Sequence, residues 1–210
     1  MKYKINSLSR DLGQTIISMK SSWRIILLSS FFLCGLIIGA YVVKNNNSLL
    51  SNQLSDIISS AIKNKSNSDF LKTFTETFIT DSVFLIISFI LGLCAVGIPL
   101  ISLIPFIKGF GIGITGAYVY SVYSIKGVCY CLFVFFPAQV LISAILIFAC
   151  NESFYMSEDI FSTLNSGSIK EKNLVRLYLT RFGLLLLFTC FTALLDALLS
   201  TVFSSVFSLF

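Results

Sequence analysis

Three glycines have the spacing of a nucleotide-binding loop. Gly111, Gly113 and Gly116 form the pattern G-x-G-x-x-G within the segment KGFGIGITGAYVY. In a dinucleotide-binding fold this loop follows a buried strand and opens a helix, and an acidic residue about 20 residues later binds the ribose. Here the preceding segment, CAVGIPLISLIPFI, contains two prolines, and the next acidic residue is Glu152. This context argues against a nucleotide site.

The same glycines suit close packing between helices. Gly109, Gly113 and Ala117 follow one another at intervals of four residues, which places them on one face of a helix. In lipid, small side chains let two helix backbones approach and gain dispersion contacts. The alternative is that glycine is simply common in membrane helices. The predicted packing residues are Gly35, Gly39, Gly109, Gly113, Gly116 and Ala117.

Side chains that could do chemistry at an active site or a metal site are scarce. The chain has no histidine, which removes the usual general base and the commonest zinc ligand. Its six cysteines lie within or beside apolar segments, and Cys129-x-Cys131 does not have the spacing of a zinc or redox motif. We therefore expect no catalytic residue, no metal and no cofactor. The net charge of +5 is explained by membrane orientation, and we expect no nucleic-acid partner.

The distribution of charge identifies the class of protein. Of the 210 residues, 56% are hydrophobic and only 12% are charged. Five charge-free runs contain 19, 26, 17, 25 and 14 residues. A helix needs about 20 apolar residues to cross the hydrocarbon layer, and the last run can be lengthened by its flanking residues. We predict an all-α integral membrane protein, a bundle of about five transmembrane helices that uses the lipid bilayer as its solvent.

The positions of the basic residues predict the orientation. With residues 1–24 in the cytoplasm and the first span at 25–43, inner segments carry ten Lys and Arg residues and outer segments carry five. Cytoplasmic loops carry the excess of basic residues in membrane proteins. Residues 44–81 are then extracytoplasmic. Residues 82–210 form a membrane bundle of four helices, with a cytoplasmic connection at 151–181 and an extracytoplasmic C-terminus.

The outer segment 44–81 has the pattern of amphipathic helices. Apolar residues recur at helical spacing, first within 50–62 and again within 70–79. Either these helices lie on the membrane surface or their apolar faces bind an extracytoplasmic partner. The residues of the possible partner surface are Leu50, Leu54, Ile57, Ile58, Phe70, Phe74 and Phe78.

Two prolines frame the end of the second predicted span. Pro99 is expected to kink the helix, and Pro105 can start the next helix because its missing N–H would be unpaired there. The tight inner turn is then expected at 106–108. Lys108 would extend to the inner membrane surface.

Three further residues stand out in the later spans. Pro137 is expected near the middle of the fourth span, where it bends the helix, and Gln139 follows at depth. Asp196 is the only carboxylate in the last apolar region. It either marks the outer end of the fifth span or is buried with a partner. We favour the first interpretation, because a buried carboxylate in a membrane is costly.

The central part of the chain resembles a known family. The run FILGLCAVGIPLISLIPFIKGFGIGITGAYVYSVYSIKG, followed by VFFPAQVLISAILIFA, is similar to the stage II sporulation protein M family. The segment NSDFLKTFTETF and the pair Asp196-Ala197 also resemble family positions. The chain departs from the family pattern at Pro137-Ala138-Gln139, where two polar residues are expected after the proline.

This resemblance implies a function for the chain. It implies a non-enzymatic membrane scaffold in endospore engulfment that localises two membrane-anchored cell-wall hydrolases, the sporulation proteins D and P. The alternative is a transporter or channel component with a substrate path near the kinked fourth helix and Gln139. Two features of the sequence argue against transport: it shows no inverted repeat, and no cluster of ionisable groups is expected at mid-membrane.

Overall fold

The protein is described by a computed structural model that covers residues 2–45, 70–94, 97–166 and 173–204. For 2–22, 123–130, 164–166, 173–174 and 203–204 this description covers the backbone alone. Every described element is a helix. The elements are α1 (Lys2–Asn45), α3 (Phe70–Gly92), α4 (Ile98–Tyr130), the π-helix η1 (Cys131–Phe135), α5 (Phe136–Ser166) and α6 (Asn173–Ser204).

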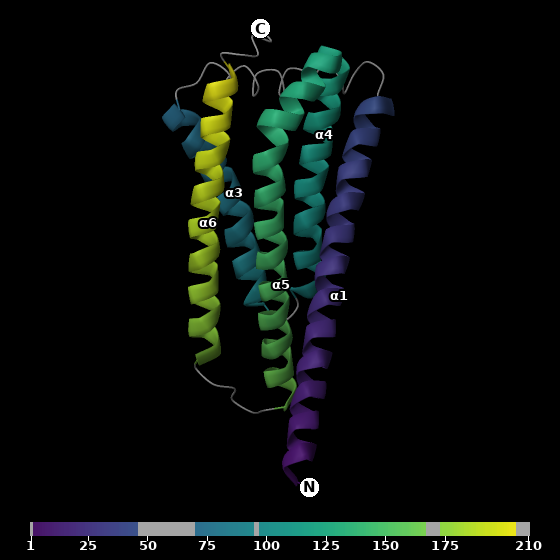
Figure 1. The fold of residues 1–210 in the computed structure, drawn as a ribbon, viewed down its shortest axis with the longest axis vertical. Coiled ribbons are helices and arrows are strands. Elements are labelled where there is room, and N and C mark those ends of the chain that lie inside the picture. Colours follow the sequence, from purple (N-terminus) through teal and green to yellow (C-terminus); the bar gives the residue numbers. More distant parts are fainter. Residues whose placement is uncertain (1, 46–69, 95–96, 167–172, 205–210) are drawn as a thin grey trace.

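Five of these helical segments are long and apolar enough to cross a membrane. They are Trp23–Asn45, Phe70–Gly92, Ile98–Val122, Cys131–Thr163 and Val175–Val202. The predicted fold class, an all-α bundle of about five spans, is confirmed. Figure 1 shows the helices side by side in one elongated bundle, with the N-terminal part of α1 extending beyond the others.

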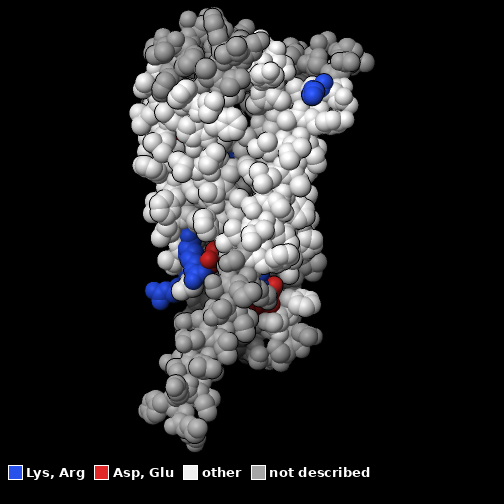
Figure 2. Space-filling model, turned by 45° about the vertical axis from the view of Figure 1, so that its right-hand side comes forward, with Lys and Arg blue, Asp and Glu red and all other residues white. Residues whose placement is uncertain are grey.

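The outer face of the bundle is apolar and its interior holds polar groups. Large side chains such as Ile37, Ile79 and Leu187 are more than 60% exposed, whereas Ser88 and Thr189 are fully buried. In Figure 2 the middle of the surface is almost entirely white, with one small blue spot between white atoms. This arrangement suits a lipid solvent, in which exposed apolar side chains cost nothing and polar groups need protein partners.

The helices alternate in direction, so that α1 and α4 run parallel to each other. The end that holds Asn45, Phe70 and Ser204 is called the upper end here, and the opposite end, with Gly92 and Asn173, the lower end (Figure 1). Since α4 leaves the lower end after the turn that follows α3, it rises beside α1. The two helices are therefore parallel neighbours that are far apart in the sequence.

Aromatic side chains fill the lower core. The Phe89 ring stacks on that of Tyr178 with centroids 5.1 Å apart, and the Phe182 ring lies 4.7 Å from that of Tyr178. Around them a cluster of buried apolar side chains joins α1, α3, α4, α5 and α6. Its members include Leu28, Leu85, Ile101, Ile104, Leu146, Ala149, Phe154 and Met156.

The turn between the second and third spans lies earlier than the sequence suggested. The helix α3 already begins at Phe70 and ends at Gly92, and α4 begins at Ile98, so the expected inner turn at 106–108 is wrong. Pro99 sits in the first turn of α4, where a missing N–H leaves no bond unmade. Pro105 is inside α4 and buried. Gly97 is required at the turn, because a Cβ there would lie 2.0 Å from the carbonyl oxygen of Leu91.

Pro137 lies near the upper end of the fourth span, and the prediction that it sits near the middle is wrong. It is the second residue of α5, two residues after the end of the π-helix Cys131–Phe135. Proline cannot bond the carbonyl four residues before it, and its ring clashes with that group. A π-turn accommodates the point at which the proline interrupts the series of backbone hydrogen bonds along the helix. Gln139 is half-buried in the next turn, also above mid-bundle.

Candidate functional site

Two glycines of α1 touch the backbone of α4. A Cβ built on Gly35 would lie 2.2 Å from the carbonyl oxygen of Phe106. One built on Gly39 would lie 2.4 Å from the carbonyl oxygen of Phe110. Real Cβ atoms do not approach backbone this closely, so no larger residue fits at either position without moving a helix.

Two glycines of α4 make the reciprocal contacts on α1. A Cβ on Gly109 would lie 2.3 Å from the carbonyl oxygen of Phe32, and one on Gly113 would lie 2.2 Å from that of Leu36. Each helix thus presents carbonyl groups to the glycines of the other. This geometry suits weak Cα–H···O=C bonds in addition to dispersion contacts. The α1–α4 interface is therefore a backbone-to-backbone contact over two turns of each helix.

The remaining two predicted packing residues lie elsewhere. No atom lies within 4 Å of a Cβ built on Gly116. Gly116 and Ala117 instead line an apolar hollow of about 310 Å³ in the upper half of the bundle, together with Leu36, Ala40 and Tyr120. The structure thus brings together four of the six predicted packing residues and places the other two beside a space.

A buried ion pair lies at the centre of the bundle. The Nζ atom of Lys108 donates to Oδ1 of Asp81 at 2.6 Å, and the two side chains are 10% and 3% exposed. Asp81 is the twelfth of the 23 residues of α3, and Lys108 lies near the middle of the span Ile98–Val122. The ammonium group also lies 5.3 Å from the centroid of the Phe84 ring, within the range of a cation–π contact.

This pair overturns two expectations. Lys108 does not reach the inner membrane surface, because α4 continues on both sides of it. Ionisable groups do occur at mid-membrane, so one argument against transport is removed. The sequence does contain one sign of this pair: Asp81 and Lys108 have opposite charges, and two such side chains can be buried together when they meet. The sequence alone did not show that they stand at equal depth.

Asp196 is buried and bonded, so its interpretation as an end marker is wrong. It is fully inaccessible, and its Oδ2 atom accepts a hydrogen bond from the Thr77 hydroxyl at 2.8 Å. Thr77 and Asp81 are four residues apart on α3 and share one face of that helix, with Cβ atoms about 5–6 Å apart. Asp196 therefore lies within about one helical turn of the Asp81–Lys108 pair. Thr73 extends the same buried face by a further turn.

A network of hydroxyl groups links three helices below the ion pair. The Ser153 hydroxyl lies 3.0 Å from that of Ser88 and 3.1 Å from that of Tyr178. Tyr178 also donates to the carbonyl of Phe89 at 3.1 Å. Gly92 closes this site, because a Cβ there would lie 2.2 Å from the Tyr178 oxygen. The network fixes α3, α5 and α6 to one another at one level.

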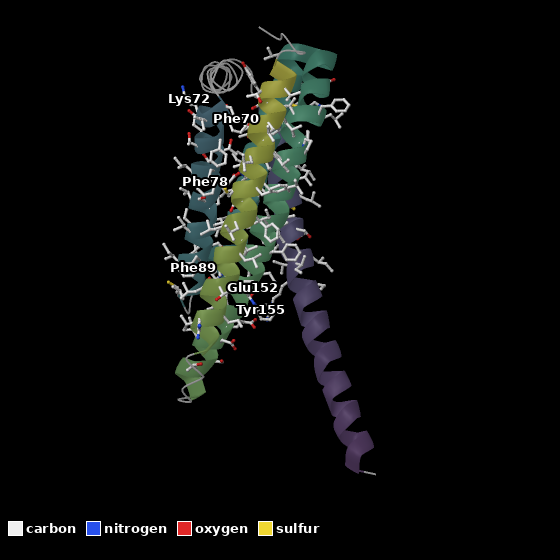
Figure 3. The ribbon with its side chains drawn as sticks, turned by 60° about the vertical axis from the view of Figure 1, so that its left-hand side comes forward. Phe70, Lys72, Phe78, Phe89, Glu152 and Tyr155 are labelled. Carbon is white, nitrogen blue, oxygen red and sulfur yellow. The ribbon has the colours of Figure 1, made fainter. Side chains whose placement is uncertain are left out.

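Two ion pairs lie near the lower end of the bundle. Arg24 of α1 binds Glu158 of α5, and its guanidinium lies 4.2 Å from the centroid of the Tyr155 ring. Arg181 of α6 donates to Glu152 of α5 at 2.5 Å. Figure 3 shows Glu152 and Tyr155 near this end, far below the phenylalanines at the start of α3.

Part of the predicted partner surface belongs to a spanning helix. Phe70, Phe74 and Phe78 occupy the first turns of α3 and are half-buried, and the last two rings stack with centroids 5.9 Å apart. Figure 3 shows Phe70, Lys72 and Phe78 at the upper end of α3. Beside them Leu71 and Ile79 are 71% and 62% exposed. The other predicted residues of this surface, Leu50, Leu54, Ile57 and Ile58, lie outside the described residues.

Several buried polar groups of the bundle bind one another. Over the described part of the chain, no three His, Cys, Asp or Glu side chains come together as metal ligands would. The ion pairs and hydroxyl bonds described above each join two helices or three. Their evident chemical role is to hold these helices in register.

Comparison with known proteins points to one family. The family model for stage II sporulation protein M matches residues 28–204 of the chain. Neither the curated proteins nor the solved structures gave a match. The matched region includes the four close glycine contacts, the Asp81–Lys108 pair and Asp196.

Proposed function

The chain belongs to the stage II sporulation protein M family, and from this premise we propose that it is a membrane scaffold that positions cell-wall hydrolases during endospore engulfment. Family membership and five candidate spans make it a multi-pass membrane protein related to sporulation. The family is not a known enzyme family. The proposed partners are membrane-anchored hydrolases such as the sporulation proteins D and P, which the family resemblance implies.

The observation that carries the proposal is the composition of the upper end of α3. Phe70, Phe74 and Phe78 stand there with the exposed Leu71 and Ile79, on a helix that is fixed below by the ion pair and the hydroxyl network. Because these residues belong to a spanning helix, a partner would meet them at the membrane boundary. A membrane-anchored hydrolase can reach that level, and large aromatic side chains are frequent anchors of interfaces.

The scaffold requires the upper end to face outwards. With Lys108 buried in the bundle, nine basic residues remain in the segments assigned to the cytoplasm and five in those assigned to the outside. This excess of basic residues still favours an orientation with the lower end in the cytoplasm, the N-terminus inside and the C-terminus outside. We propose this orientation together with the function.

Replacement of the three phenylalanines by serine tests the scaffold. The variant Phe70→Ser/Phe74→Ser/Phe78→Ser should abolish septal localisation of a fluorescent hydrolase while the protein still accumulates in the membrane. Accumulation is measured by immunoblot. The matched control is Leu184→Ser/Leu187→Ser/Phe191→Ser, which removes three large side chains, each at least half exposed, from α6. Normal recruitment by the α3 variant at normal abundance would end the proposal, as would equal loss in the control.

The second candidate, a transporter or channel component, is favoured by the ionisable groups at mid-membrane. Asp81, Lys108 and Asp196 lie where charged side chains are rare and commonly mark an ion or proton pathway. This function predicts that purified protein in liposomes carries an ion flux that Asp81→Asn abolishes. It also predicts sensitivity to Gln139→Leu and tolerance of the α3 serine variant. A scaffold predicts the opposite result: the α3 serine variant loses recruitment of the hydrolase, and Gln139→Leu keeps it.

A further inference from the structure

Two arginines border a hollow on the lipid-facing side of α6. The hollow has a volume of about 340 Å³ and is lined by Arg176, Leu177, Thr180 and Arg181. All four side chains are exposed. They occupy the second and third turns of the helix, close to its start at Asn173. In Figure 2, Lys and Arg atoms gather with Asp and Glu atoms near this lower end of the described surface.

The hollow carries a net positive charge. Arg181 donates to Glu152 at 2.5 Å, yet its side chain remains 51% exposed. A guanidinium has five N–H donors, and one carboxylate accepts at most a bidentate pair of them. Among the described residues Arg176 has no carboxylate partner. Within the described part of the chain, two cations face one carboxylate here, and such a site attracts an anion.

The neighbours of the arginines show which anion can reach the site. On the same helix Leu177, Leu184 and Leu187 are 51%, 50% and 73% exposed, as expected for side chains that contact acyl chains. Arg176 is the second residue of the span Val175–Val202, and Arg181 lies about 7.5 Å deeper along the axis. Long arginine side chains at such depths extend to the level of the headgroups.

We propose that Arg176 and Arg181 bind the headgroup phosphate of an anionic phospholipid at the lower end of α6. Arg176, which has no carboxylate partner among the described residues, supplies positive charge, and the half-exposed side chain of Arg181 supplies further donors. Leu177 contacts the acyl chains on the membrane side of the phosphate. This site is independent of the proposed scaffold function, because it lies at the opposite end of the bundle from the α3 phenylalanines.

Lipid titration of the purified full-length protein tests the site. In a neutral detergent, phosphatidylglycerol is titrated against phosphatidylcholine, and bound lipid is counted by native mass spectrometry. Wild-type protein should bind phosphatidylglycerol more tightly, and Arg176→Gln should weaken that binding about fivefold, as expected for one basic residue at a lipid surface. The control Lys72→Gln removes an exposed charge at the upper end and should leave binding unchanged.

Four outcomes would overturn the proposal. Phosphatidylglycerol could bind no more tightly than phosphatidylcholine, or Arg176→Gln could bind as well as wild type. If Lys72→Gln lost as much phosphatidylglycerol binding as Arg176→Gln, the net charge of the protein would explain the binding without a specific site. A further arm adds inorganic phosphate at concentrations equal to the lipid. Full competition by phosphate would identify a site for the free anion and refute the assignment to lipid.

Discussion

Replacement of Gly113 by alanine tests whether α1 and α4 depend on backbone contact. The added Cβ would lie 2.2 Å from the carbonyl oxygen of Leu36, 3.0 Å from its carbonyl carbon and 3.1 Å from the amide nitrogen of Ala40. All three atoms belong to backbone, so no side chain can rotate away. An ordinary Cβ contact begins near 3.4 Å, so the helices must separate locally by more than 1 Å.

The cost of this separation is estimated from overpacking. Forcing an extra methyl group into a packed site typically costs about 1–3 kcal/mol. Displacing α1 also weakens the neighbouring contacts at Gly35, Gly39 and Gly109, which depend on the same spacing. We expect a loss of about 2–3 kcal/mol, towards the upper part of that range. In a chain of this length each kcal/mol lowers the Tm by about 2–4 °C.

Gly116→Ala is the matched control. It makes the same chemical change one turn further along the same helix, where no atom lies within 4 Å of the new Cβ. Alanine is a better helix former than glycine by up to about 1 kcal/mol, so this variant should be neutral or slightly more stable. Thermal unfolding in one detergent compares the two proteins. If Gly113→Ala melted at the same temperature as Gly116→Ala, close backbone approach would not hold the pair together.

Three further predictions concern the interior and the orientation. Asp81→Asn should destabilise the bundle by about 3–5 kcal/mol, because it leaves Lys108 buried without its carboxylate. The double variant Asp81→Leu/Lys108→Leu should recover most of that loss. If the single and double variants lost equal stability in the same thermal assay, this explanation would be contradicted. Tyr178→Phe removes a buried hydroxyl that joins three helices and should lower the free energy of unfolding by about 1–3 kcal/mol in that assay. An unchanged unfolding temperature would show that the hydroxyl network does not stabilise the bundle. In a cysteine-free variant, a cysteine at Ser66 should react with an impermeant thiol reagent added from outside and one at Ser162 should not, whereas reversed labelling would refute the orientation.

The fold class could be predicted from the sequence because it depends on composition and length. Charge-free runs reveal helices that must pair their own backbone in lipid, whatever their neighbours are. The glycine pattern also carried information, since intervals of four place small residues on one face. Which helix that face meets could not be read from the spacing. Gly35 meets Phe106, about 70 residues away, through tertiary packing alone.

The buried charges were misplaced for an identifiable physical reason. A charge next to an apolar run normally marks its end, because an isolated charge is costly in lipid. Asp81 and Lys108 escape that cost by pairing, so the run of 26 residues between them was assigned to one span although it contains a turn. Gly97 followed by Pro99 was the local signal for that turn. Asp196 was misplaced for the same reason, since its bond to Thr77 comes from another helix.

The position of the Asp81–Lys108 pair has a consequence for how the protein enters the membrane during translation. The helix α3 leaves the ribosome first and brings an aspartate to the centre of the bilayer, at a cost of about 2.5–3.5 kcal/mol on insertion scales. Lys108 arrives only after α3 has ended and α4 has begun, and the pair then neutralises both charges. The helix α3 should therefore stay beside the insertion channel until α4 emerges, and the two should partition into lipid as a hairpin. Since α1 also packs against the glycine face of α4, the earlier helices can first assemble with one another when the third span is inserted.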